Sequence, residues 1–336
     1  HTRNSDGTPL TGGINVSTET EVKLALEDTT AEQLQAQAEI VSHAVGSPRQ
    51  RQVDSVYFDT GRLSLLKRGI ALRLRRDGDR WLQTVKTSGS TSAGLHQRGE
   101  WETAIEGKHL QLNRFDQPQL KKLFAKAGLR EALAPVFRTV FQRTTWDLHY
   151  GQDAHIEMAL DLGQIRAGGN SSRISEVELE LIKGSPEDLL KTGRALAETL
   201  PVRLLNASKA DRGYRLAGHM PPPRATKAGA VELRKKASAE RAFITILQRG
   251  IFQLQANEPL VLSRPRDIEG AHQMRVASRS MRSCLQLYRP LIPTAVSAEA
   301  SSNIRRVTDA LGPARDWDVF IEETLLPLRQ EFPQHQ

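Results

Sequence analysis

The sequence has a single cysteine and lacks any long apolar run, and both absences narrow the class of protein. Cys284 has no partner for an internal disulfide, which favours a reducing compartment. No stretch approaches the roughly 20 apolar residues of a membrane span, and none has the pattern of a secretory signal peptide. We therefore expect a cytoplasmic protein without membrane contact. A starting Met is also absent, so we expect the sequence to begin inside a longer chain.

A length of 336 residues is long for one domain, and the net charge of +8 suits a polyanionic partner. The segment 212–236 has seven basic residues, one acid and Pro221-Pro222-Pro223, a composition typical of an exposed connector. We therefore expect four parts, namely a lead-in at 1–16, a strand-rich domain at 17–216, a Pro-rich basic linker at 217–230 and a helical domain at 231–336.

The segment 19–26 alternates charged and apolar residues. Glu19, Glu21 and Lys23 share one face of the expected strand, because successive side chains of a strand point to opposite sides. For one strand alone, a solvent-facing side is the ordinary explanation. Five further segments repeat the pattern, at 70–76, 81–86, 97–105, 156–162 and 175–182.

These charged faces gather Arg and Lys on some strands and Glu on others, whereas solvent faces usually mix polar types. A sheet closed with these faces inward would have a basic wall and an acidic wall. Arginine binds phosphate oxygens by paired hydrogen bonds, and carboxylates bind hard divalent ions. The pattern therefore indicates a tunnel for a phosphate chain with metal.

Three helices are expected between the strands. A capping box at Thr30 and Gln33 begins the first, whose buried stripe is Leu34, Ala38, Val41 and Val45. The second spans about 117–127 and buries Leu120, Leu123 and Phe124. The third begins at Ser185-Pro186 and buries Leu189, Leu190, Leu196 and Leu200.

Seven motifs of residues 17–216 occur in the order typical of one family. They are Glu19-x-Glu21-x-Lys23, Tyr57-Phe58-Asp59-Thr60, Ala71-Leu72-Arg73-Leu74-Arg75, Thr84-Val85-Lys86, Arg98-Gly99-Glu100-x-Glu102, Leu160-Asp161-x-Gly163 and Glu176-x-Glu178-x-Glu180. The segment resembles the CYTH, or triphosphate tunnel metalloenzyme, superfamily. The resemblance implies an α+β fold in which an eight-stranded antiparallel tunnel with peripheral helices binds a linear triphosphate and Mg²⁺ or Mn²⁺. Members hydrolyse inorganic or thiamine triphosphate, cyclise ATP, or remove the RNA 5′-γ-phosphate.

The resemblance assigns roles to the inward charges. Expected metal ligands are Glu19, Glu21, Asp161, Glu176 and Glu178. Expected phosphate-binding residues are Lys23, Arg73, Arg75, Lys86, Arg98, Arg138 and Lys209. Further inward charges are Glu100, Glu102, Arg143, Glu157 and Glu180. Arg138 and Arg143 have opposite parity in the segment 137–143, so both face inward only across a bulge, and we favour Arg138.

After the linker the apolar period becomes helical. His272, Arg275, Arg279 and Arg282 fall on one helical face, Arg305, Arg306 and Arg315 follow, and Leu311-Gly312-x-x-Arg315-Asp316-x-Asp318 comes later. Residues 231–336 resemble a partial CHAD domain, an all-helical module associated with polyphosphate binding, so either the module is shortened here or its remainder is missing. The alternative is that these arginines are surface charges or pair with Asp316, Asp318 and Glu322.

The expected activity is metal-dependent hydrolysis of inorganic triphosphate to pyrophosphate and phosphate, with long-chain polyphosphate as a partner of the helical module. Intact inward carboxylates favour an enzyme, since they repel phosphate unless metal intervenes. The alternatives are a class IV-type adenylate cyclase, another organic triphosphatase, and a non-catalytic polyphosphate-binding protein. No nucleic acid partner is expected.

Overall fold

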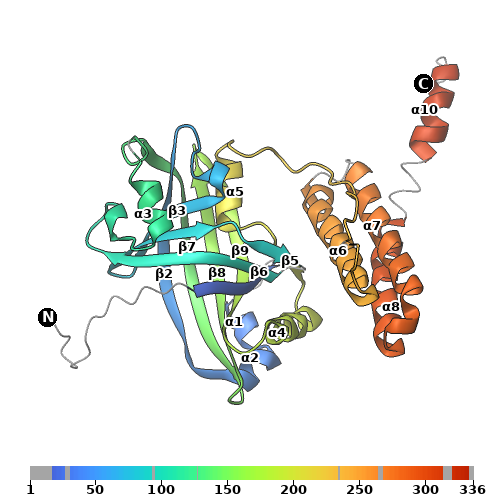
Figure 1. The fold of residues 1–336 in the computed structure, drawn as a ribbon, viewed down its shortest axis with the longest axis horizontal. Helices are drawn as coiled ribbons and strands as arrows, with labels where there is room; N and C mark the ends of the chain where they lie inside the picture. Colours follow the sequence, from blue (N-terminus) through green and yellow to red (C-terminus); the bar gives the residue numbers. More distant parts are fainter. Residues whose placement is uncertain are drawn as a thin grey trace. The chain divides into compact units, whose positions relative to one another are not determined.

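The computed structural model describes residues 17–26, 31–92, 95–126, 128–233, 235–263, 268–312 and 320–332. The chain divides into two compact units, His1–Pro221 and Pro222–Gln336. The first unit contains all of the described strands, and the second is helical (Figure 1).

Eight antiparallel strands of the first unit close into a ring. In order around it they are β1 (Ser17–Leu26), β9 (Asn170–Lys183), β8 (Ala154–Ala167), β7 (Leu133–Tyr150), β2 (Ala44–Thr60), β3 (Ile70–Asp77), β4 (Arg80–Thr87) and β6 (Leu95–Ile105). The pairing of β1 with β6 closes the ring, and the short strands β5 (Ser90–Ser92) and β10 (Val202–Leu204) pair outside it. The predicted eight-stranded antiparallel tunnel is therefore confirmed.

The alternation in β1 assigns its two faces as the sequence predicted. Val22, Leu24 and Leu26 face outward into a core with β7, β8 and β9. Helices α1 (Ala31–Gln35), α2 (Ala38–His43) and α4 (Pro186–Thr199) lie together over this side of the sheet (Figure 1). Their Leu34, Ile40, Leu189 and Leu196 complete the core, so the charged face of β1 is left to the lumen.

A second outer core covers β3 and β4. Here α3 (Pro118–Phe124) packs Leu120 and Phe124 against Leu72 and Val85, next to the 3₁₀ turns η1 (Leu66–Arg68) and η2 (Leu112–Arg114). Because Leu72 and Val85 face outward, Arg73 and Lys86 face inward.

Helix α5 (Lys209–Leu216) packs on β7, β8 and β9. Its Tyr214 joins Tyr57, Phe137 and Phe141 in an apolar cluster on the lumen side of the strands. A Cβ at Gly213 would lie 2.2 Å from the Phe137 ring, so glycine permits the helix to come this close. One part of the lumen is therefore filled by apolar side chains.

Three residues predicted to be buried on helices are exposed. Val41 is 70% exposed and Val45 is 59% exposed. Helix α1 ends at Gln35, α2 begins at Ala38, and β2 begins at Ala44. The segment is therefore not one continuous helix, and the predicted stripe of buried residues does not hold across it. Leu190 is 44% exposed, because Leu189 and Leu196 define the buried face of α4 and Leu190 lies about 100° around from Leu189. Thr30 lies outside the described residues.

The second unit is built on α6 (Ala239–Ser263), α7 (Ile268–Leu287) and α8 (Thr294–Ala310). A 3₁₀ turn η3 (Arg289–Leu291), a π-helical turn η4 (Ile321–Leu325) and α10 (Leu326–Glu331) follow in sequence. As predicted, Met274, Ala277, Met281 and Leu285 form the buried face of α7. None of the described helices has the length and apolar character needed to cross a membrane.

The segment before α6 is attached to that helix. The Asn257 side chain accepts a hydrogen bond from the Thr226 amide at 2.8 Å and donates one to the Thr226 carbonyl at 2.9 Å. Asn257 is fully buried, and the two bonds satisfy both ends of its amide. Part of the Pro-rich basic segment therefore belongs to the compact helical unit.

Candidate functional site

The lumen contains a cavity of about 600 Å³ lined mainly by charged side chains. Six of the residues predicted to bind phosphate line it, namely Lys23, Arg73, Arg75, Lys86, Arg98 and Lys209. Carboxylates interleave with these cations, so almost every cation of the cavity has an anionic partner. A ligand that enters must exchange these ion pairs for its own.

On one wall, three carboxylates from adjacent strands converge. Oxygen atoms of Asp161, Glu176 and Glu178 lie within 4.8 Å of one another. Asp161 and Glu176 have fully buried side chains, and the Glu178 side chain is 16% exposed. We call these residues the acidic triad. They lie next to one another because β8 pairs with β9 in a register that places Asp161 opposite Glu176.

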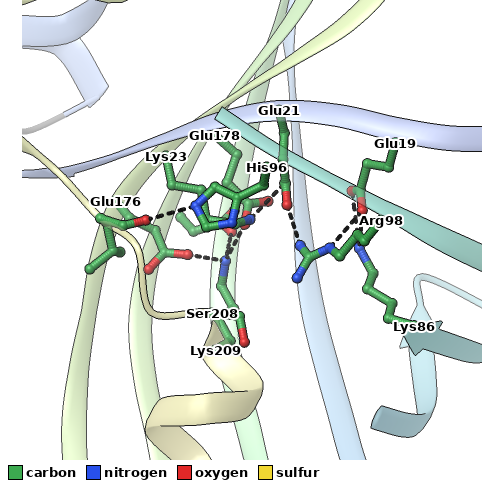
Figure 2. Close-up of polar contacts among 12 residues, drawn as sticks. Glu19, Glu21, Lys23, Lys86, His96, Arg98, Glu176, Glu178, Ser208 and Lys209 are labelled. Carbon is green, nitrogen blue, oxygen red and sulfur yellow. Dashed lines mark hydrogen bonds and ion pairs between the residues drawn. The ribbon is translucent and has the colours of Figure 1, made fainter. Parts of the chain in front are cut away.

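Cations contact all three carboxylates of the acidic triad. Arg143 donates two hydrogen bonds of 2.7 Å to Asp161 and one to Glu178. Lys209 Nζ lies 2.6 Å from Asp161 Oδ2 and 3.1 Å from Glu178 Oε1, and it also bonds Glu176 (Figure 2). Burial raises the pKa of Glu178, but Lys209, Lys23 and Arg143 outweigh it and hold that pKa well below its usual range.

The first strand brings a second group of charges. Lys23 Nζ lies 2.6 Å from Glu21 Oε2, and Arg98 from β6 bonds both Glu21 and Glu19 (Figure 2). Lys86 Nζ lies 2.9 Å from Glu19 Oε2. Burial raises the pKa of Glu19, but the cations Lys86, Arg98 and Lys23 outweigh burial and lower that pKa below its usual range. This carboxylate is therefore held ionised. The Glu-x-Glu-x-Lys motif is therefore one connected charge network.

Strands β3 and β6 supply a third group of charges, in which arginines and carboxylates pair. Arg73 lies 3.4 Å from Glu100, and Arg75 lies 2.7 Å from Glu102. Both arginine side chains are only 12–13% exposed. Their Nε–H groups are buried donors for which the described residues offer no acceptor. Such donors favour an anionic ligand, because an unsatisfied buried donor is costly.

Our preference for Arg138 over Arg143 is wrong. β7 pairs with β8 in continuous register from Arg138 to Tyr150, so no bulge brings both side chains to one face. Arg143 points into the lumen and has a 13% exposed side chain, whereas the side chain of Arg138 is 54% exposed and pairs with Asp54 on the outer face. The charge expected from this strand is present, at the other residue.

Glu157 and Glu180 face each other across β8 and β9 and also line the cavity. Burial, together with the neighbouring carboxylates of Glu19, Glu157 and Glu100, raises the pKa of Glu180 to about 7, although Lys86 opposes the shift. Carboxylates therefore outnumber cations at this end of the cavity. The exposed Arg49, which lies 3.6 Å from Glu157, offsets only part of their negative charge.

Arg212 and His96 contact the site but were not predicted from the sequence. Arg212 bonds Glu176 from the next turn of α5, and its spacing from Lys209 was a usable signal, because residues three apart share a helical face. His96 has the same parity as Arg98, one residue before the segment predicted as a strand. Its Nε2 lies 3.3 Å from the Leu205 carbonyl oxygen, and burial together with Lys23 lowers its pKa.

The predicted basic residues of the helical unit lie on the side of α7 away from its buried face. Arg279 and Arg282 are exposed, and His272 and Arg275 are half-buried. Arg305 and Arg306 on α8 are exposed as well. Arg315, Asp316 and Asp318 lie outside the described residues, as does the side chain of Glu322.

The residues of the lumen suit a divalent cation. The acidic triad offers hard oxygen donors close enough to share one ion, and such donors are those that Mg²⁺ and Mn²⁺ prefer. Glu19 and Glu21 add two more carboxylates on the neighbouring strand β1. The donor set therefore fits a hard metal ion, in a lumen that also carries inward arginines and lysines.

A closed antiparallel tunnel with inward cations and convergent carboxylates has the groups that suit polyanions and hard metal ions. The CYTH domain model matches residues 17–214, more than half of the chain, and the chain belongs to this family. The CHAD domain model matches residues 245–336, so the predicted order of CYTH followed by CHAD is confirmed.

Individual relatives match parts of the chain. An inorganic triphosphatase of Haemophilus influenzae is 36% identical over 167 residues, 48% of this chain and 45% of that protein. The chain thus spans less than half the length of this curated relative. A solved Hippeastrum protein, described as an adenylyl cyclase with a dominant triphosphatase activity, is 19% identical, with a TM-score of 0.45 over 61% of this chain and 98% of that chain. A solved Mimivirus capping enzyme triphosphatase is 10% identical, with a TM-score of 0.32 over 55% and 90% of the two chains.

Proposed function

We propose that the tunnel hydrolyses inorganic triphosphate to pyrophosphate and phosphate with Mg²⁺ or Mn²⁺. The observation that carries the proposal is the joint presence, in one cavity, of inward arginines and lysines and of a convergent acidic triad. A cavity built only to bind polyphosphate would gain nothing from buried carboxylates, which repel phosphate in the absence of a metal ion. The inorganic triphosphatase of Haemophilus influenzae, similar over 167 residues, supports the same reaction.

The side chains of the chain itself have clear tasks in this reaction. Arg73 and Arg75 would donate hydrogen bonds from their unsatisfied Nε–H groups to phosphate oxygens. Lys86 and Arg98 would give up their ion pairs with Glu19 and pair with the substrate instead. The triad, with Glu19 and Glu21, would hold the divalent cation, which when bound neutralises phosphate charge and activates water. Because these groups are fixed on strands of a closed sheet, they need little reorganisation as the reaction proceeds.

We expect inorganic triphosphate to be hydrolysed with a kcat/KM at least about tenfold above that of ATP, with no cyclic product from ATP. Inorganic triphosphate has charged terminal oxygens at both ends, so cations on both walls can bind it, whereas ATP has an ester at one end. Phosphate release from a panel of inorganic triphosphate, thiamine triphosphate and ATP, each with Mg²⁺ and with Mn²⁺, measures this directly. Cyclic AMP as the main product would replace the proposal by the cyclase alternative.

We further propose that the helical unit binds long-chain polyphosphate. His272, Arg275, Arg279 and Arg282 follow one another along α7 on the side left free by its apolar contacts, and Arg305 and Arg306 are exposed on α8. A row of cations on a rigid helix suits the regularly spaced charges of a polyphosphate chain. Affinity should fall steeply with salt, because each neutralised phosphate releases counterions, by analogy with nucleic acids.

Replacing Arg275, Arg279 and Arg282 together by Ala should weaken polyphosphate binding at least about tenfold and leave triphosphate hydrolysis nearly unchanged. Calorimetric titration at two salt concentrations compares this variant with wild type and with a control of equal charge change. The control replaces Arg80, Arg114 and Arg194 by Ala, three exposed arginines of the tunnel unit. Equal affinities for all three proteins would leave the arginines of α7 as ordinary surface charges.

A further inference from the structure

The Lys209 ammonium occupies the centre of the acidic triad. It lies 2.6 Å from Asp161 Oδ2 and 3.1 Å from Glu178 Oε1, and it bonds Glu176 as well. Among the described cations it alone contacts all three carboxylates, since Arg143 contacts two of them and Arg212 and Lys23 contact one each. The side chain is 8% exposed. Lys209 therefore lies where one ion shared by the triad would lie.

This position is fixed from outside the triad. Lys209 begins α5, whose first turn is capped by Ser208 through the Asp211 amide. The Lys209 Nζ also lies 5.0 Å from the centroid of the Phe141 ring, at cation–π distance. The three carboxylates and the ring together hold the ammonium, so it can leave the acidic triad only when its Nζ moves away.

We propose that Lys209 is a built-in counter-ion of the metal site, which a divalent cation displaces from the acidic triad into the cavity, where the freed ammonium binds substrate phosphate. The inference deepens the proposed function, since it concerns the metal and substrate of the same site. The triad cannot surround an ammonium and a divalent ion at once, because like charges at this separation repel strongly. Lys209 already lines the cavity, so its flexible four-carbon stem needs only to redirect its end.

The exchange makes metal and substrate binding cooperative. A metal ion loses affinity because it must displace Lys209, and it regains part of that loss when phosphate accepts the freed ammonium. By thermodynamic linkage, phosphate binding tightens metal binding to the same degree. A lumen without metal therefore keeps its carboxylates neutralised and its structure intact.

Lys209→Met should bind Mn²⁺ at least about tenfold more tightly than wild type in the absence of any phosphate compound, because no competing charge remains. The titration follows free Mn²⁺ by electron paramagnetic resonance. Arg75→Met is the control, since it removes one buried cation from the same cavity at Glu102, outside the triad. Tightening in Lys209→Met that is no greater than in Arg75→Met would overturn the proposal.

A second measurement uses the wild-type protein and does not depend on the folding of a variant. Acetylation of Lys209, followed by mass spectrometry, should increase at least about threefold when Mn²⁺ is added, because the ammonium leaves its buried contacts. Lys121, an exposed lysine on α3, serves as the internal reference. Unchanged labelling of Lys209 at saturating Mn²⁺ would overturn the proposal. Neither measurement contains triphosphate, so a failure of the proposed hydrolysis would leave both results unaffected.

Discussion

Glu21→Gln should lower kcat/KM for inorganic triphosphate by at least about 100-fold and should raise the Mg²⁺ concentration needed for half-maximal activity. Glu21 is 1% exposed and faces the lumen between Lys23 and Arg98. The amide keeps the shape of the side chain but removes the charge that would face a metal ion. Steady-state rates across a Mg²⁺ series separate the loss of turnover from the change in metal requirement.

The variant should remain folded, because both cations that Glu21 contacts keep a second carboxylate. Lys23 still has Glu178, and Arg98 still has Glu19. The matched control is Glu198→Gln, the same change at a side chain on α4 that is 66% exposed. If Glu21→Gln and Glu198→Gln have the same turnover and the same metal dependence, the carboxylates of β1 do not serve a metal in this reaction.

The face of β1 was predictable because a strand has a period of two and because its apolar residues are all of one parity. Val22, Leu24 and Leu26 pack in a hydrophobic core on one side of the strand. The Glu and Lys residues of the motif therefore lie on the opposite side, which faces the lumen. The same reasoning placed Arg73 and Arg75 in the lumen. Where one parity is apolar and the other charged, the sequence determines which residues line the cavity.

The prediction that Arg138 faces the lumen was wrong because inward residues are not charged along the whole lumen. Phe137 and Phe141 face inward into the apolar cluster beneath α5. The inward face of this strand is therefore partly apolar, and charge alone does not identify it. Arg143 lies on the inward face of β7, opposite Asp161 of β8. That register between two strands cannot be read from the sequence of β7 alone.

The contact between the acidic triad and the cations of α5 was not predicted, for a related reason. The carboxylates of the triad were assigned correctly to inward faces, but the cations at their centre come from α5, and Lys209 is 33 residues away from Glu176 in sequence. The helix that begins after Ser208 was not among the three expected, and the capping box that the structure shows there does not tell what a helix packs against. Contacts of this kind depend on the closed sheet.

The arginines of β7 give the second large expected effect, because Arg138 and Arg143 lie on one strand and face opposite sides. Arg143→Gln should lower kcat/KM for inorganic triphosphate by at least about 100-fold, since Asp161 and Glu178 lose a bidentate cationic partner beside the substrate cavity. Arg138→Gln should change it by less than about threefold, because an exposed ion pair with Asp54 contributes little.

Both variants must be shown to be folded, and Arg143→Lys separates charge from geometry. Lys209 still neutralises Asp161 and Glu178 in each Arg143 variant, so thermal unfolding should remain cooperative, with Arg143→Gln melting at a lower temperature than wild type. The lysine keeps one charge but loses the paired hydrogen bonds to Asp161, so its activity should lie between wild type and Arg143→Gln. If Arg138→Gln were instead the inactive variant while Arg143→Gln kept full activity, substrate would bind on the outer face of β7, and the lumen would not be the active site.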